Sequence, residues 1–266
     1  MTDRKTTQES YWDNRLENAF NHAGTGMLAY GPFFNWWVYQ ICKIRFKQEV
    51  GKLPVNLKNG TFLDVGCGTG FYLRQWQSLG AGNLVGLDIS KSAITRLAHS
   101  YPGWQLIHAD IGACDNPLPP DHFHAVSAMA VFFHIVDDYR LEMALQNINR
   151  SLKKEGYLIL SDNFLHRERS GWGVYHTSRA LTEYGQFLQK AGFTVIHRAP
   201  MFVLAGDPVD SRGRLLYWHW RLITWCASRS NLVGGLIGGI IFPLDLLLTA
   251  ILKEGPTTEI MICQKR

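Results

Sequence analysis

From Gly60 onward the chain alternates short apolar runs of strand length with segments of helical period. A parallel sheet produces this alternation, because each parallel connection needs a crossover of a dozen or more residues and that crossover is usually a helix. The order along the chain predicts an α/β fold with a doubly wound, mostly parallel sheet covered by helices on both faces. The strand-length runs are TFLDVG, NLVGLD, WQLIHAD, HAVSAM, YLILSD, FTVIHRA and the terminal TEIMICQKR, which has no helix after it.

The residues before Gly60 follow a helical pattern instead. Apolar residues recur at helical spacing over about 11–22 and 33–49, and the Gly31-Pro32 pair separates the two segments. Hydrophobic residues make up 46% of the chain and charged residues 18%, which excludes a disordered protein.

The net charge and the cysteine content indicate which binding partners and which cellular compartment to expect. The net charge of +5 is mild, and from it we expect no nucleic-acid partner. The five cysteines form no CxxC pair, so the sequence predicts neither a disulfide framework nor a zinc knuckle. The first ten residues, MTDRKTTQES, lack the apolar region of a secretory signal, and we expect a cytoplasmic location.

The stretch LDVGCGTGFY is the most informative motif. Its glycines follow the first predicted strand and precede the first predicted helix, where they let the backbone turn tightly and let a ligand lie against it. Asp88 ends the second strand, where a carboxylate can accept both hydroxyls of a ribose. A dinucleotide dehydrogenase with the pattern GxGxxG would have glycine at position 71, but the residue there is Phe71.

Taken together, DVGCGTG (64–70), GLDIS (86–90), HADI (108–111), LKKEGYLIL (152–160) and the final strand resemble the class I S-adenosylmethionine-dependent methyltransferases. The resemblance implies a Rossmann-like seven-stranded sheet with an antiparallel last strand. It also implies an enzyme with S-adenosylmethionine as cofactor: the glycine loop lies beside the methionine part, Asp88 binds the ribose, Asp110 and Ile111 contact the adenine, and residues 128–130 lie near the sulfonium. The implied cofactor-binding residues are Asp64, Gly66, Cys67, Gly68, Gly70, Asp88, Ile89, Asp110, Ile111, Ala128 and Met129. For Asp110, a turn-capping role is the alternative.

Two histidines are candidates for a catalytic base. Methyl transfer depends mainly on alignment, but an oxygen acceptor usually needs a nearby base. His134 follows the fourth strand, at the sheet edge where ligands of open α/β folds bind, and His176 follows the fifth. For both residues a packing or capping role is the alternative, and we favour His134 as the base.

Metal ions and nucleobase amines are both disfavoured by the residues after the fourth strand. Ser127, Ala128 and Met129 supply no carboxylate for a hard cation, so we expect no metal. The segment SAMAVFF also lacks the (Asn/Asp)-Pro-Pro-aromatic motif of methyltransferases that act on exocyclic amines of nucleobases, and the Pro-Cys of cytosine C5 enzymes.

The apolar segment LVGGLIGGIIFPLDLLLTAIL lies between the sixth and seventh predicted strands. Its length approaches that of a membrane span, but Pro243 predicts a break into two short helices, with Asp245 in the first turn of the second. We favour a lid or substrate-cavity wall over a peripheral membrane surface, and either over a span. The expected domains are an N-terminal helical cap (1–50), a methyltransferase core (51–201 with 257–266) and an apolar helical insertion (202–256).

An apolar lid predicts an acceptor with apolar surface, because pockets match what they desolvate. We therefore expect methyl transfer to a small hydrophobic or lipid-linked acceptor, at oxygen. Nitrogen or carbon acceptors, and a non-catalytic cofactor-binding or membrane-docking protein, are the alternatives. The residues expected to bind the acceptor are Trp36, Trp37, Phe133, Tyr175 and Trp218. The sequence leaves the oligomeric state open.

Overall fold

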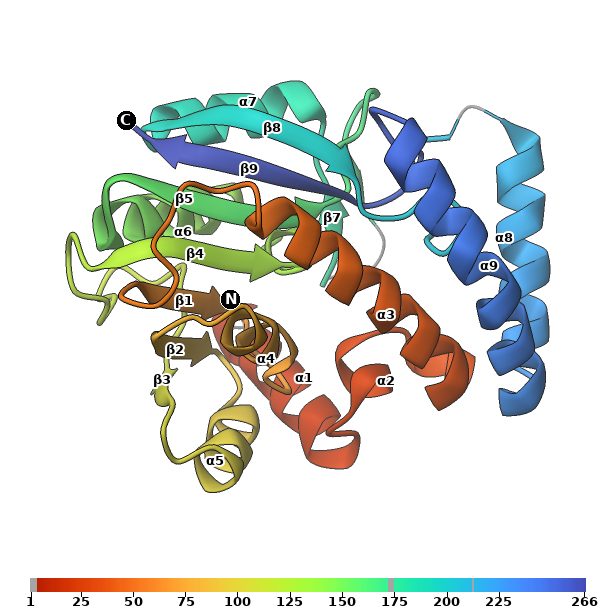
Figure 1. The fold of residues 1–266 in the computed structure, drawn as a ribbon, viewed down its shortest axis with the longest axis horizontal. Helices are drawn as coiled ribbons and strands as arrows, with labels where there is room; N and C mark the ends of the chain where they lie inside the picture. The colour runs from red at the N-terminus through yellow and green to blue at the C-terminus, as the bar shows by residue number, and fades with distance from the viewer. Residues whose placement is uncertain (1–3, 172–174, 212) are drawn as a thin grey trace.

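The computed structural model describes residues 4–171, 175–211 and 213–266, and its centre is a seven-stranded sheet of order β3-β2-β1-β4-β5-β9-β8 (Figure 1). β9 runs antiparallel to both neighbours and the other strand pairs of this sheet are parallel, which confirms the predicted fold class. The strands are β1 (Thr61–Val65), β2 (Asn83–Asp88), β3 (Gln105–His108), β4 (Phe123–Met129), β5 (Leu152–Asp162), β8 (Phe193–Pro200) and β9 (Glu259–Lys265), and the short pair β6 (Ser170–Gly171) and β7 (Thr177–Ser178) forms a separate ribbon.

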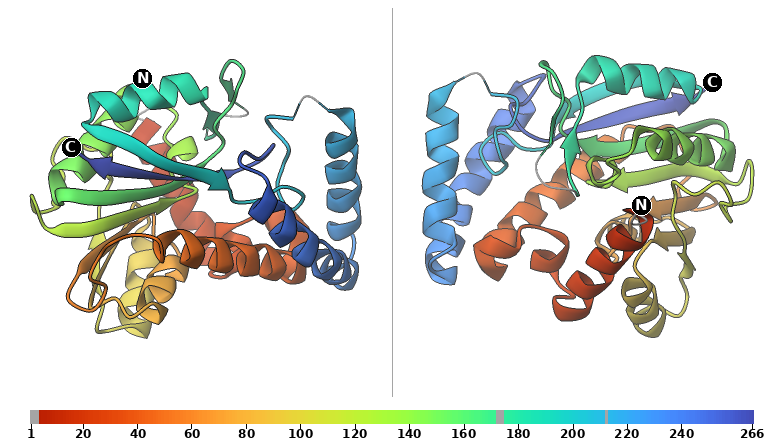
Figure 2. Two further views of the ribbon diagram at one scale, coloured as in Figure 1. Left: turned by 45° about the horizontal axis from the view of Figure 1, so that its top comes forward. Right: turned by 180° about the vertical axis from the view of Figure 1, so that it is seen from behind.

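Helices cover both faces of the sheet, as the alternating pattern predicts (Figure 2). One apolar core joins the sheet to α3, α4, α8 and α9, and the other joins it to α6 and α7. The helices are α1 (Arg4–Asn18), α2 (His22–Thr25), α3 (Gly31–Val50), α4 (Phe71–Ser78), α5 (Lys91–Ser100), α6 (Asp138–Ser151), α7 (Leu181–Lys190), α8 (Arg214–Ala227) and α9 (Asn231–Ile251), with 3-10 turns η1 (Leu28–Tyr30) and η2 (Phe132–His134).

The insertion forms a helical pair, but its second helix is not broken at Pro243. α9 continues through that residue for 21 residues, so the prediction of two short helices is wrong. Close packing against α3 explains the difference. A β-carbon at Gly238 would lie 2.6 Å from the Trp37 ring, so only glycine permits this approach. This tertiary contact outweighs the cost of about 3 kcal/mol for proline inside a helix.

Asp245 anchors α9 to the chain that follows β8, rather than capping a second helix. Its side chain is fully buried and accepts hydrogen bonds from the backbone N–H groups of Val203 (2.8 Å), Leu204 (3.3 Å) and Ala205 (2.7 Å). Burial raises the pKa of this carboxyl, and the three N–H donors oppose that rise. α9 is therefore fixed to the core by a polar contact as well as by packing.

Candidate functional site

The glycine loop directly follows β1. The strand order of the sheet reverses beside this strand, between β1 and β4. Ligands of open α/β sheets bind at such a point, beyond the carboxyl ends of the strands. Gly66, Gly68 and Gly70 have φ values of 67°, 49° and 73°, in the left-handed region that favours glycine. The loop therefore takes the open backbone turn that the sequence predicts.

Asp88 holds this loop in shape from the end of β2. One carboxylate oxygen accepts from the N–H of Gly68 (2.7 Å) and the other from the N–H of Ser90 (2.8 Å). Two carboxylate oxygens offer about four acceptor positions, so Asp88 retains the capacity to accept two ribose hydroxyls. Burial raises its pKa, and the two backbone N–H donors counteract this.

Asp64 presents a buried acceptor with no partner. The Ser127 hydroxyl donates to Oδ1 (2.6 Å), while Oδ2 has no hydrogen-bond partner among the described residues. Burial raises the pKa of Asp64 to about 7. Such an orphaned oxygen suits a cationic ligand group, and the ammonium of the methionine part of S-adenosylmethionine is one. Together with the open glycine loop and Asp88, it makes the residues present here fit that cofactor.

Replacing Asp64 by asparagine is expected to weaken cofactor binding and to change the pH dependence of stability. An aspartate has a pKa near ~3.9 in unfolded chains and about 7 here, so its favourable contribution exists at low pH and is lost as pH rises through about 7. We expect Asp64→Asn to be more stable than wild type at pH 8, by a few kcal/mol at most, and to lose more than half of that advantage at pH 5. Urea unfolding at both pH values and calorimetric titration with S-adenosylmethionine measure the two effects.

Asp162→Asn is the matched control for this prediction. Asp162 is also buried, with a pKa raised to about 7 by burial, but it ends β5 and accepts from the N–H of Asn163 and the hydroxyl of Tyr184. This variant should show the same change in pH dependence with unchanged cofactor affinity. Tight cofactor binding by Asp64→Asn would contradict the role assigned to Asp64.

Asp110 lies in a different setting from Asp88. It is ion-paired with Arg140, and its Oδ1 accepts from the N–H of Gly112 (2.9 Å), so it caps the turn after β3. Ile111 is buried beside it, and its carbonyl accepts from Asn147. The turn-capping alternative for Asp110 thus has a structural basis. Contact of Asp110 and Ile111 with adenine stays a prediction. Cofactor contact likewise stays a prediction for Cys67, Ile89, Ala128 and Met129.

A left-handed residue turns the chain after β4 and places His134 at the site. Ala130 has φ 59°, a conformation that costs a non-glycine residue about 1 kcal/mol. Its N–H donates to the carbonyl (3.1 Å) and the hydroxyl (2.9 Å) of Ser161, which hold it there. The short turn η2 follows directly and ends at His134.

His134 is a half-buried, neutral imidazole. Its Nδ1 lies 2.9 Å from the carbonyl oxygen of Tyr175, and a carbonyl can only accept, so Nδ1 carries the proton and Nε2 keeps a lone pair. Burial, with smaller effects from nearby His176 and Arg15, lowers the pKa of His134 to about 4, although its hydrogen bond to the Tyr175 carbonyl opposes the shift. The ring is therefore neutral at neutral pH, and Nε2 is the nitrogen that can accept a proton.

Some of the predicted acceptor residues surround His134 and others do not. Phe133 lies against both histidine rings, the His134 and His176 centroids are 6.0 Å apart, and Tyr175 stacks on Tyr11. Burial lowers the pKa of His176 to about 4. Trp36 and Trp37 instead lie on α3 facing α9, and Trp218 is exposed on α8. The structure thus brings Phe133, Tyr175 and the two histidines together, apart from the three tryptophans.

Helix α1 contributes residues that sequence reasoning missed. The Trp12 ring meets His134 edge-on at 4.9 Å, and the side chain of Gln8 donates to the His134 carbonyl. Asp13 accepts from Ser90 (2.8 Å for the hydroxyl) at the start of α5, next to Asp88. Ser127, which cannot supply a carboxylate to a metal, instead orients Asp64 through its hydroxyl. No local signal marks α1, because its partners lie some 80 to 120 residues further along the chain.

Comparison with known proteins identifies the central segment. Residues 63–160 match the family described as "Methyltransferase domain". Over 160 residues the chain is 31% identical to the tRNA U34 carboxymethyltransferase of Pseudomonas aeruginosa, covering 56% of this chain and 47% of that protein. The chain spans about half, or less, of the length of the curated relatives it matches.

Solved structures of low identity share the fold across the whole chain. An S-adenosylmethionine-dependent methyltransferase from Leishmania major has a TM-score of 0.64 at 15% identity, covering 98% of this chain and 83% of that one. Magnesium protoporphyrin IX methyltransferase from Synechocystis, with bound S-adenosylmethionine, has a TM-score of 0.57 at 14% identity, covering 100% and 99%. The predicted fold is confirmed. The match of residues 63–160 to a methyltransferase domain agrees with the predicted enzyme class and cofactor.

The prediction that the chain has no nucleic-acid partner is wrong. Relatives of this chain carry the name tRNA U34 carboxymethyltransferase. The net charge alone is a poor guide, because it would exclude a nucleic-acid partner for any chain of this composition. Net charge averages over the whole surface, whereas phosphate binding needs only a local cluster of basic residues.

Proposed function

We propose that this chain, which carries a class I S-adenosylmethionine-dependent methyltransferase domain, transfers the donor's methyl group to an oxygen of a small hydrophobic or lipid-linked acceptor. The observation that supports the oxygen is His134, a neutral imidazole with an available Nε2 lone pair beside the end of β4. This edge of the sheet is also where the glycine loop, Asp64 and Asp88 lie.

The chain's own residues account for the chemistry in simple terms. Bound S-adenosylmethionine supplies an electrophilic methyl group, and the protein contributes by aligning the acceptor with it. His134 accepts the acceptor's hydroxyl proton at Nε2 while the carbonyl of Tyr175 holds Nδ1–H in place. Burial keeps the imidazole neutral, and the Trp12 ring of α1 packs edge-on against it.

The side chains around His134 support an apolar acceptor. Trp12, Phe133 and Tyr175 present aromatic rings there, and pockets are lined to match the surface they desolvate. For the whole protein we propose a cytoplasmic location with contact at the membrane surface. The distant aromatic residues Trp36, Trp37 and Trp218 belong to that surface rather than to the acceptor pocket.

A tRNA acceptor is the second candidate, favoured by the names of the relatives that match the core. That similarity covers 56% of this chain and 47% of the relative. A tRNA acceptor would differ from a hydrophobic one in the attacked atom, in the transferred group and in the need for His134 as a base. The two candidates can therefore be distinguished by experiment.

Transfer of radioactive methyl groups from S-adenosylmethionine tests the proposal directly. Purified protein is incubated with a total lipid extract and, separately, with purified bulk tRNA, and the label in each fraction is counted. Label in the lipid extract that is absent with Asp88→Ala supports the proposal. Label in tRNA alone replaces it with the second candidate, and label in neither fraction contradicts methyl transfer to both.

A further inference from the structure

Helices α8 and α9 expose long apolar stripes. On α8 the outward residues recur at helical spacing as Leu215, Trp218, Leu222 and Trp225, and on α9 as Leu232, Leu236, Ile240, Leu244, Leu247 and Ile251. Leu215 is 82% exposed and Ile240 67%. We call these two stripes, with the outward residues Phe33 and Trp36 of α3, the apolar face. Folded proteins rarely expose so many large apolar side chains together without a binding partner.

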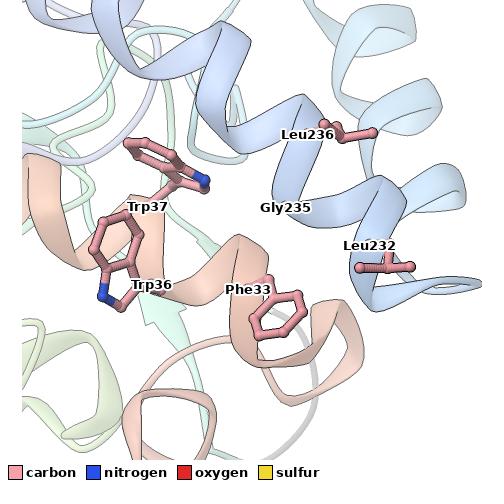
Figure 3. A pocket seen from close by; sticks show the side chains of 6 residues that line it. All are labelled: Phe33, Trp36, Trp37, Leu232, Gly235 and Leu236. Atoms are coloured by element: carbon pink, nitrogen blue, oxygen red, sulfur yellow. The ribbon is translucent and has the colours of Figure 1, made fainter.

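The three helices lie side by side, with α9 between α3 and α8 (Figure 1). Between α3 and α9 the apolar face is hollowed into a groove of about 430 Å³ (Figure 3). Its lining is entirely aromatic, aliphatic or glycine: Phe33, Trp36, Trp37, Leu232, Gly235 and Leu236. An occupant of this groove must itself be apolar.

α9 alone among the described helices is long and apolar enough to cross a membrane, with a mean hydropathy of 2.0. It is nevertheless held on the protein. Asp245 binds three backbone N–H groups of the segment 203–205, and Gly238 packs against Trp37. If α9 left these contacts to span a bilayer, Asp245 would enter hydrocarbon and the three N–H groups would lose their acceptor, which is costly. The geometry therefore favours a helix lying along a membrane surface over one that spans it.

The charges of this region are complementary to an anionic surface. In residues 214–251 the basic side chains are Arg214, Arg221 and Arg229, and the one acidic residue is the buried Asp245. The Arg229 guanidinium lies 3.9 Å from the Trp225 ring centroid, and Arg221 lies 5.8 Å from that of Trp218. Tryptophan and arginine together are typical of the membrane–water interface.

We propose that the apolar face docks this protein on an anionic phospholipid bilayer. The leucines and isoleucines of α8 and α9 enter the acyl boundary, the groove between α3 and α9 takes an acyl chain, and Arg221 and Arg229 contact lipid phosphates. A second copy of the chain would bury the apolar stripes equally well, but it would bring the same arginines against each other and gain nothing from their charge. Docking is independent of methyl transfer and can be tested without a methyl acceptor.

Vesicle sedimentation tests the proposal with the full chain. Wild type should pellet with vesicles of phosphatidylcholine and phosphatidylglycerol, and more weakly with phosphatidylcholine alone. The double variant Leu222→Glu/Ile240→Glu should bind the mixed vesicles at least tenfold more weakly, since each change places a charge at the centre of one stripe. Arg221→Gln with Arg229→Gln should lose roughly fivefold per arginine on anionic vesicles, with little change on phosphatidylcholine.

Ile196→Glu is the matched control, because Ile196 is a 49% exposed apolar residue on β8, outside the apolar face. It should sediment like wild type. Circular dichroism and S-adenosylmethionine binding check that every variant is folded. Wild type that stays in solution with anionic vesicles overturns the proposal, as does a double variant that binds normally. If wild type does not bind vesicles, two results would identify a different occupant of the apolar face. A dimer that the double variant dissociates would point to a second copy of the chain, and tRNA binding that is lost with the two arginines would point to tRNA.

Discussion

Asp88→Ala is expected to weaken S-adenosylmethionine binding at least about a hundredfold, measured by calorimetric titration. Hydrogen bonds to a charged group contribute about 1.5–3 kcal/mol each, and a ribose would lose two of them. The alanine variant also removes the acceptors of the Gly68 and Ser90 N–H groups, which hold the glycine loop. Both effects act in the same direction.

Asp88→Asn separates the two effects, because the amide keeps one acceptor oxygen for the loop and removes the charge. We expect it to bind the cofactor more tightly than Asp88→Ala and more weakly than wild type. Asp115→Ala, at an exposed carboxylate outside the site, should leave the affinity unchanged. If folded Asp88→Ala bound S-adenosylmethionine as wild type does, Asp88 could not be the ribose ligand.

The core of the fold and the cofactor side of the site are predictable because their determinants are local. Short apolar runs of strand length alternate with segments of helical period, and glycine at 66, 68 and 70 marks the positions where the loop takes left-handed φ values. Asp88 ends its strand at the expected position, and its contact with the loop is set by the parallel pairing of β1 with β2.

The acceptor side depends on contacts between distant segments. Trp12 reaches His134 only because α1 packs across the end of the sheet, and periodicity in residues 4–18 does not reveal where that helix lies. In α9 the local signal of Pro243 points to a break, whereas tight packing of glycines against α3 keeps the helix continuous. Tertiary contacts of this kind outweigh local propensity and have no signature in a single sequence.

His134→Asn is expected to lower turnover by about 10²–10⁴-fold if the acceptor atom is oxygen, the range that general base catalysis contributes. Asparagine keeps an N–H donor for the carbonyl of Tyr175 and removes the lone pair at the position of Nε2. Cofactor affinity should therefore stay unchanged. The measurement is the rate of S-adenosylhomocysteine formation at saturating S-adenosylmethionine, with whichever acceptor the labelling experiment identifies.

The pH profile distinguishes a base from a packing residue. A base must be unprotonated, and burial lowers the pKa of His134 to about 4, so wild-type turnover should stay level from pH 8 down to about pH 5.5 and fall only below that. An ordinary imidazole, with a pKa near ~6.5, would be about 90% protonated at pH 5.5 and would already have lost most of its activity there. His176→Asn is the control, expected within about threefold of wild type. Turnover that survives in His134→Asn would show that no base is needed, which fits a nitrogen or carbon acceptor, since such atoms can attack the methyl group without first losing a proton to the enzyme.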